Sequence, residues 1–135
     1  MALKILRGTI SGAIVYFLLG WLVYGILLMD FFSAGMNQCV NRPLGEMIWW
    51  AIIVSNLALA LLLTLILHWK KAAGIVDGLV TGVIFGALFT IMIDFSFWSM
   101  STMYNNISTI LVEIVVSAAL YAVVGIVIVL TWGRK

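Results

Sequence analysis

Four long apolar stretches, separated by short polar segments, dominate the sequence. They run over residues 10–29, 47–67, 73–95 and 108–131. A helix rises about 1.5 Å per residue, so about 20 apolar residues cross a hydrocarbon core of about 30 Å. In lipid every backbone polar group needs a partner within the chain, which favours helices over an open sheet. The pattern predicts an all-α fold: an integral membrane four-helix bundle, with residues 1–135 forming a single transmembrane domain.

Composition supports a membrane environment. Apolar residues make up 65% of the chain and charged residues 9%, against about 25% charged residues in soluble domains. A small soluble domain has too little interior to bury that much apolar surface. The net charge of +2 and the lack of a basic, aromatic-interleaved patch argue against a nucleic-acid partner. The lipid bilayer is therefore the expected partner of most of this surface.

Positive charge gathers on one side of the predicted topology. Six of the seven basic residues precede span one, follow span two or follow span four: Lys4, Arg7, Lys70, Lys71, Arg134 and Lys135. Only Arg42 falls on the other side. Because basic residues concentrate in cytoplasmic loops, both termini are expected in the cytoplasm.

Two pairs of similar segments suggest an internal repeat. Residues 29–36 resemble residues 93–100, and residues 65–71 resemble residues 128–135, at offsets of 64 and 63 residues. Two spans per unit would make a parallel repeat of two helical hairpins with the same topology. The alternative is chance similarity between apolar segments that end alike.

Four of the five carboxylates occupy equivalent places at the non-basic ends of the spans. They are Asp30, Glu46, Asp94 and Glu113. A bundle would gather them into an acidic ring, which favours cations. Oxygen ligands suit hard cations, and nearby amides could add more: Asn37, Asn41, Asn105 and Asn106. The alternative is that each acid is a hydrated charge where a helix leaves the membrane.

Glu113 is the most informative of these acids because membrane-compatible residues precede it. A carboxylate inside a span costs roughly 2.5–3.5 kcal/mol on insertion scales, so it should face protein or water. Its helical row continues through a polar and small stripe: Ser117, Tyr121 and Gly125. Asp94 and Glu113 could form a proton or cation relay. A structural hydrogen bond from Glu113 to Tyr121 or Arg42 is the alternative.

Small and polar residues recur at four-residue spacing in the other spans. Span three carries Gly78, Gly82 and Gly86, followed by Thr90 and Asp94, and span one opens with Gly8 and Gly12. Span two has a milder polar row at Asn56, Ala60 and Thr64. Small residues let helices approach closely in lipid. We expect packing inside the bundle, with a dimer or gating interface as the alternative.

Candidate residues for catalysis or metal binding are sparse. His68 is the only histidine and Cys39 the only cysteine, so no zinc or haem ligand set can be assembled from them. His68 is assigned to the membrane interface. No nucleophile motif accompanies it. The chain is therefore expected not to be an enzyme and to need no cofactor.

The segment Leu19-Gly20-Trp21-Leu22-Val23-Tyr24-Gly25 resembles a motif in a family of small bacterial membrane proteins of unknown function. Asp77-Gly78 at the start of span three and Trp132 at the end of span four resemble that family too. The resemblance covers most of the chain. It implies four spans in a bacterial inner membrane, and no particular activity.

Three functions fit the sequence. The favoured hypothesis is a small cation or polar-solute binding or transport protein, which would have to form a homo-oligomer to enclose a pathway. The first alternative is a non-catalytic accessory or scaffold subunit of a larger membrane complex. The second is a lipid or hydrophobic-ligand binder that uses Tyr16, Trp21 and Tyr24 within span one.

Overall fold

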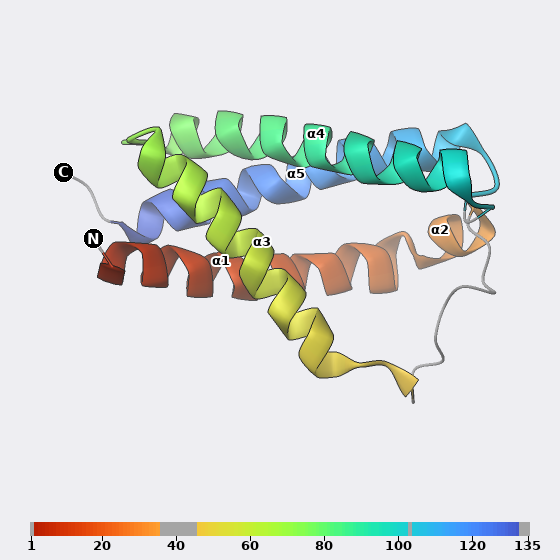
Figure 1. Cartoon of the computed structure of the whole chain (residues 1–135), viewed down its shortest axis with the longest axis horizontal. Coiled ribbons are helices and arrows are strands. Elements are labelled where there is room, and N and C mark those ends of the chain that lie inside the picture. The colour runs from red at the N-terminus through yellow and green to blue at the C-terminus, as the bar shows by residue number, and fades with distance from the viewer. Residues whose placement is uncertain (1, 36–45, 103, 133–135) are drawn as a thin grey trace.

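The computed structural model describes residues 2–35, 46–102 and 104–132, and these ranges are helical with short connecting turns (Figure 1). The elements in chain order are α1 (Ala2–Leu22), a short π-helix (Val23–Leu27), α2 (Met29–Gly35), α3 (Trp49–Trp69), α4 (Ile75–Met100) and α5 (Ile107–Thr131). Four segments are long and apolar enough to cross a membrane, the first formed by α1 with the π-helix. The predicted all-α membrane bundle is confirmed.

The helices extend beyond the predicted spans by five or more residues in two places. The first helix begins at Ala2, eight residues before the start of the apolar run, because the basic residues before the run do not interrupt helical hydrogen bonding. Helix α4 continues to Met100, since residues 95–100 contain no glycine or proline. Asp94 therefore lies inside α4 and does not end it.

The first span ends differently. The π-helix at Val23–Leu27 is followed by Leu28, whose φ of −114° and ψ of 13° leave the helical region. A new short helix, α2, then starts at Met29 and carries Asp30 in its first turn. The chain changes direction at this break, so Asp30 is separated from the helix face that precedes it (Figure 1).

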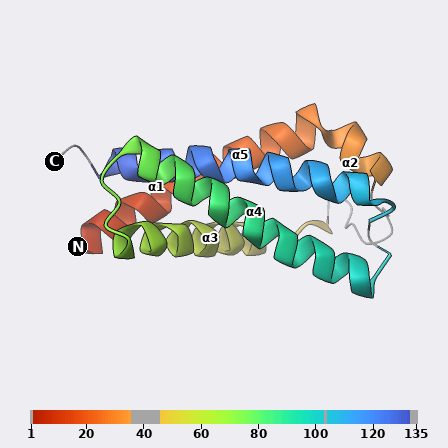
Figure 2. The same ribbon diagram turned by 90° about the horizontal axis from the view of Figure 1, so that it is seen from above.

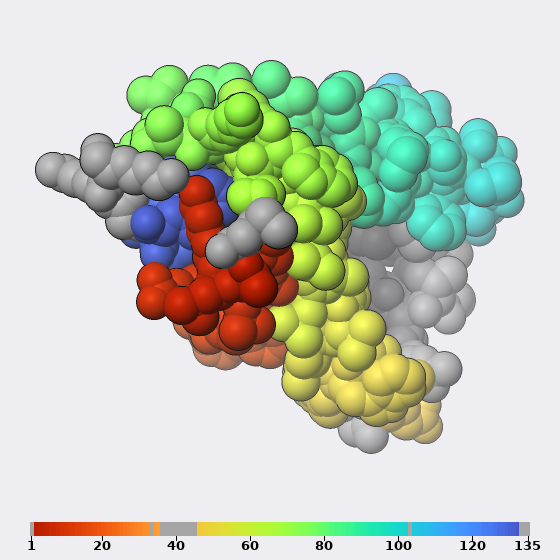
Figure 3. All heavy atoms as spheres, turned by 60° about the vertical axis from the view of Figure 1, so that its left-hand side comes forward, coloured from red at the N-terminus to blue at the C-terminus, as the bar shows by residue number. Residues whose placement is uncertain are grey.

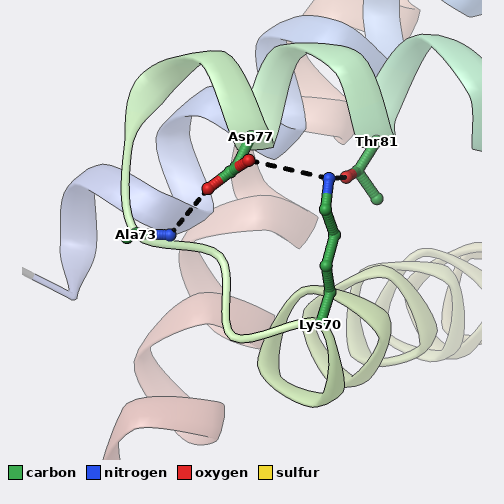
Figure 4. Close-up of polar contacts among 4 residues, drawn as sticks. All are labelled: Lys70, Ala73, Asp77 and Thr81. Atoms are coloured by element: carbon green, nitrogen blue, oxygen red, sulfur yellow. Dashed lines mark hydrogen bonds and ion pairs between the residues drawn. The ribbon is translucent and has the colours of Figure 1, made fainter.

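Helix α1 begins and α5 ends at the same end of the bundle (Figures 1 and 2). We call this the basic end, because its described charges are mainly Lys4, Arg7, Lys70 and Lys71. The opposite end, where α4 gives way to α5, is the acidic end. The tight turn between α3 and α4 lies at the basic end, where Lys70 Nζ donates to Thr81 Oγ1 at 2.9 Å and lies 3.7 Å from Asp77 Oδ1 (Figure 4). The same carboxyl accepts a hydrogen bond from the Ala73 backbone N–H at 3.0 Å.

Helices α4 and α5 form an antiparallel hairpin with a close backbone contact, which we call the glycine seam. The α4 side of the seam is the row Gly78, Gly82, Gly86, Thr90 and Asp94, and all five residues are buried. A Cβ built on Gly78 would lie 2.5 Å from the Gly125 carbonyl oxygen, and one on Gly86 would lie 2.7 Å from that of Ser117. Only residues without a side chain allow this approach.

Helix α1 packs on its neighbours mainly through its first half. A Cβ on Gly8 would lie 2.8 Å from Thr64 Cγ2 of α3, and one on Gly12 would lie 3.0 Å from Ile128 Cδ1 of α5. The glycines of both rows are thus buried within one chain.

The hydrophobic cluster shared by α3 and α5 occupies the basic half of the bundle, while Ile110 and Tyr104 are buried toward the acidic end. The most buried members of the cluster are Leu63, Leu67, Val124 and Ile128. On α3 the buried residues are confined to the stretch from Ala60 to Leu67. The first half of α3 diverges from α4 toward the acidic end and is largely exposed (Figure 1). The bundle is consequently tight at one end and open at the other.

Candidate cation-binding cleft

The divergence of α3 opens a cleft of about 530 Å³ between the four long helical segments. Its polar lining consists of Tyr16, Tyr24, Ser55, Thr90, Asp94, Glu113, Ser117 and Tyr121. In the space-filling view, the yellow end of α3 stands away from the cyan end of α4 (Figure 3). Tyr16, Leu59 and Tyr121 line the cleft and also pack on the hydrophobic core, so the core closes the cleft toward the basic end.

Asp94 and Glu113 meet through the hydroxyl of Tyr104. The Tyr104 Oη lies 2.8 Å from Asp94 Oδ1 and 3.0 Å from Glu113 Oε2. Tyr104 is buried in the turn between α4 and α5. The glycine seam brings the two acids to this place, because each ends a row of close contacts between the two helices.

When both carboxyls are ionised, Asp94, Glu113 and Tyr104 have one acidic proton between them, that of the phenol. A phenol carries one proton and can donate it to one acceptor at a time. The second short contact is completed if one carboxyl carries a proton and donates it to the phenol oxygen. Two carboxylates this close also repel each other when both are ionised. The cluster therefore favours one bound proton or a cation beside the acids.

The second carboxyl oxygen of Asp94 receives no hydrogen bond from an N–H or O–H group of the described residues, and Glu113 is its neighbouring acid. Asp94 is 3% exposed, and its Oδ2 is buried with no hydrogen-bond partner in the part of the chain that the structure describes. The one ion pair among residues 2–35, 46–102 and 104–132 joins Lys70 to Asp77 at the basic end. A buried, unpaired carboxylate oxygen is costly. Since Asp94 lines the cleft, a positively charged ligand would supply the missing partner.

Tyrosines form the walls beside the acids. The Tyr24 and Ser117 hydroxyls lie 3.3 Å apart and share a hydrogen bond between the π-helix and α5. The ring centroids of Tyr16 and Tyr121 are 5.1 Å apart, and Phe85 meets Tyr121 edge-on at 5.2 Å. These contacts fix the aromatic rings around the cavity. Phe89 and Thr90 of α4 add to the same lining.

The turn that carries Tyr104 is held by its own hydrogen bonds. Asn106 caps α5, because its Oδ1 accepts the Thr109 backbone N–H at 3.0 Å. Asn105 Nδ2 donates to the Ala34 carbonyl oxygen of α2 at 3.0 Å. Burial raises the pKa of the Tyr104 hydroxyl far above its usual range, and the carboxyls of Glu113 and Asp94 raise that pKa further. Tyr104 consequently stays protonated and acts as a donor.

The predicted ring of four acids is not assembled. Asp30 and Glu46 are exposed and do not line the cleft, whereas Asp94 and Glu113 do. Within the described ranges no three acidic, histidine or cysteine side chains are grouped so as to hold a metal ion. Asp30 is displaced because the break at Leu28 comes before it.

The other predicted site residues divide between the cleft and its surroundings. Thr90, Ser117 and Tyr121 line the cleft, while Asn56 is half-buried on α3 and does not. Asn105 and Asn106 are engaged in holding the turn. Asn37, Asn41, Cys39, Arg42, Arg134 and Lys135 lie outside the described residues. Glu113 bonds to Tyr104 and not to Tyr121 within the described contacts, and Arg42, the other partner of the structural alternative, lies outside the described residues.

Tyr104 is the site residue that sequence reasoning missed. The signal available was its position, since it is the tyrosine in a turn of six residues that joins the two helices with the innermost acids. A residue in so short a turn must lie near both helix ends. The sequence did not indicate that its hydroxyl would point back between the helices.

The fold and the cleft define a multi-pass membrane protein whose four-helix bundle holds a buried acid pair. Comparison with protein-family models, with curated proteins and with solved structures finds no match to this chain.

Proposed function

We propose that the protein binds an organic cation, a quaternary or protonated amine with an apolar body, and exchanges it for a proton as a small transport protein. The observation that carries this proposal is the buried, unpartnered Oδ2 of Asp94 at the wall of the cleft. A cation placed there would satisfy that oxygen and balance the second carboxylate of the pair.

The lining favours an organic cation over a metal ion. Calcium takes about six to eight oxygen ligands, and the described residues gather two carboxylates and no larger acidic, histidine or cysteine group. Aromatic rings attract cations by about 0.5–2 kcal/mol each, and Tyr16, Phe89 and Tyr121 face the cavity. The volume of about 530 Å³ falls in the range of small-molecule sites.

Exchange follows from the proton count at the acid pair. A bound cation balances the negative charge that the shared proton of Asp94, Glu113 and Tyr104 otherwise balances. The proton can then leave. Because the core closes the cleft toward the basic end, we place ligand access where α3 diverges from α4. Release on the other side would need movement of α3 or a second copy of the chain, and we include a homo-oligomer in the proposal.

The orientation and location are part of the proposal. The four basic residues at the basic end favour a cytoplasmic position for that end, which places the cleft in the outer half of the membrane. The family resemblance implies that this membrane is a bacterial inner membrane.

A binding titration on the purified full chain tests the proposal. The probe is benzyltrimethylammonium, and its neutral control is neopentylbenzene, which has the same shape with carbon in place of nitrogen. The variant Glu113→Gln should weaken probe binding about tenfold or more, since about 1.4 kcal/mol corresponds to tenfold. Asp30→Asn is the matched control, because it removes an exposed acid at the same end.

Equal affinity for the charged and the neutral probe would contradict a cation site. It would instead favour the hydrophobic-ligand alternative, which the apolar wall at Leu59, Leu62 and Ile93 also fits. Trp21 would not belong to that site, since it is 61% exposed on α1 and does not line the cleft.

A further inference from the structure

A second cavity, of about 330 Å³, lies at the basic end and shares no lining residue with the cleft. Its lining includes Lys4 from the start of α1, His68 from the end of α3, Lys71 from the next turn and Trp132 after α5. Val129 supplies an apolar wall. Lys4, His68 and Lys71 carry nitrogen donors with a positive or ionisable character, and they come from two parts of the chain, the start of α1 and the end of α3.

The positive charge of this cavity is not neutralised within the described residues. Lys4 Nζ lies 4.4 Å from the centroid of the Trp132 ring, and Trp132 Nε1 donates to the Lys4 carbonyl oxygen at 2.9 Å. Asp77 is the acid at this end, and it pairs with Lys70, which does not line the cavity (Figure 4). Lys4 and Lys71 therefore have no acidic partner in the part of the chain that the structure describes.

Lys71 adopts a backbone conformation that usually selects glycine. Its φ is 60°, in the left-handed region. The Ala72 N–H donates to the Leu67 carbonyl oxygen at 3.0 Å, and the Lys71 N–H donates to that of His68 at 3.0 Å. This pair of bonds is the Schellman ending of a helix, in which glycine is the common residue at this position. Lysine here is unfavourable for the backbone, and its side chain lines the cavity.

We infer that this cavity binds the phosphate group of an anionic phospholipid headgroup. Basic pockets between transmembrane helices bind such headgroups on the cytoplasmic side, and tryptophan favours the same interfacial depth. A free phosphate ion has the same recognition chemistry. The lipid is the expected source because the cavity lies where apolar helices end, beside the hydrated headgroup layer.

Native mass spectrometry of the full chain in detergent tests this site. The probes are dioleoylphosphatidylglycerol, dioleoylphosphatidylcholine with the same acyl chains, and inorganic phosphate. Wild type should retain phosphatidylglycerol over phosphatidylcholine, and Lys71→Gly should bind it about fivefold more weakly, the effect of one lysine near a lipid headgroup. Arg7→Gln is the matched control: it removes an exposed charge at the same end of the bundle, which lies outside the cavity, and should keep the lipid affinity.

The Lys71→Gly variant separates binding from folding. Glycine suits the left-handed position, so this variant should unfold at the same temperature as wild type or a higher one. Equal phosphatidylglycerol retention by wild type and Lys71→Gly would overturn the assignment of the cavity. Inorganic phosphate that displaces the lipid at equal concentration would overturn the lipid as the source. Because Glu113 plays no part here, failure of this test leaves the cation cleft unaffected.

Discussion

The two hairpins of the chain are built from similar apolar helices and pack in opposite ways. Helices α4 and α5 touch from the basic end to the acid pair, because a row of small residues on α4 faces the backbone of α5. Helices α1 and α3 pack mainly in the half of the bundle near the basic end, where Gly8 and Gly12 lie. Beyond Ala60, toward the acidic end, α3 turns outward (Figure 1).

The difference shows how one bundle can be both stable and open. The tight hairpin holds Asp94 and Glu113 at a fixed separation across Tyr104. The splayed pair leaves the space in front of those acids unfilled. If both hairpins were tight, the cleft would close; if both were splayed, the acids would not meet. The internal repeat suggested by the sequence stays a prediction. Asp30 and Asp94 would be equivalent in that repeat, yet Asp30 is exposed and Asp94 is buried.

Gly82→Ala is expected to have the largest effect on the tight hairpin. The added Cβ would collide with the carbonyl of Tyr121, and backbone cannot move aside as a side chain can. We expect the free energy of unfolding to fall by about 3 kcal/mol, measured by denaturant titration in mild detergent. Gly20→Ala is the control, because a Cβ at Gly20 meets nothing within 4 Å. Similar stability of both variants would contradict the glycine seam.

Tyr104→Phe tests the acidic end of the same hairpin and should have an intermediate effect. It removes a hydroxyl that bonds two carboxyls, a loss of about 1–2 kcal/mol in the free energy of unfolding. Tyr24→Phe is the matched control, since its hydroxyl makes one longer contact, with Ser117 at 3.3 Å. If Tyr24→Phe destabilises the protein as much as Tyr104→Phe does, the Tyr104 hydroxyl does not join Asp94 to Glu113.

Gly8→Ala probes the splayed pair and should have the smallest effect. Its Cβ would lie 2.8 Å from Thr64 Cγ2 and 3.0 Å from Ile128 Cγ2, so it meets buried side-chain methyl groups at longer range than the backbone contact at Gly82. We expect the free energy of unfolding to fall by less than about 1 kcal/mol, because helix propensity favours alanine by about as much as crowding opposes it. A loss as large as that of Gly82→Ala would mean that the two pairs pack alike.

The sequence predicted the helices and the rows of the site but not how the rows meet. Four-residue spacing identified both the Gly78–Asp94 row and the Glu113–Gly125 row, since helical periodicity defines a face. It does not define which face a neighbour covers, so the pairing of Gly78 with Gly125 came from the structure. The predicted acidic ring was wrong for Asp30, because a π-helix and a break in the helix precede this residue. The residues at the break are apolar, and nothing in the sequence marks the break.

The residues that open the cleft were equally hard to predict. Apolar residues predominate in both halves of α3, and Ser55 and Asn56 in the first half did not by themselves indicate that this half leaves the bundle. The cause lies in α1, against which α3 packs. The glycines that allow the close contact, Gly8 and Gly12, both lie in the first half of α1. Such effects depend on tertiary contacts, which a single sequence does not display.

The central claim, that Asp94, Glu113 and Tyr104 hold a proton that a cation replaces, is tested most directly by counting protons during the benzyltrimethylammonium titration. Calorimetry in two buffers of different ionisation enthalpy gives the number released per bound probe. Wild type and Asp30→Asn should release up to about one proton, and the Glu113→Gln variant should release almost none. Tight binding by wild type with no proton released, or equal release by Glu113→Gln, would contradict exchange at the acid pair.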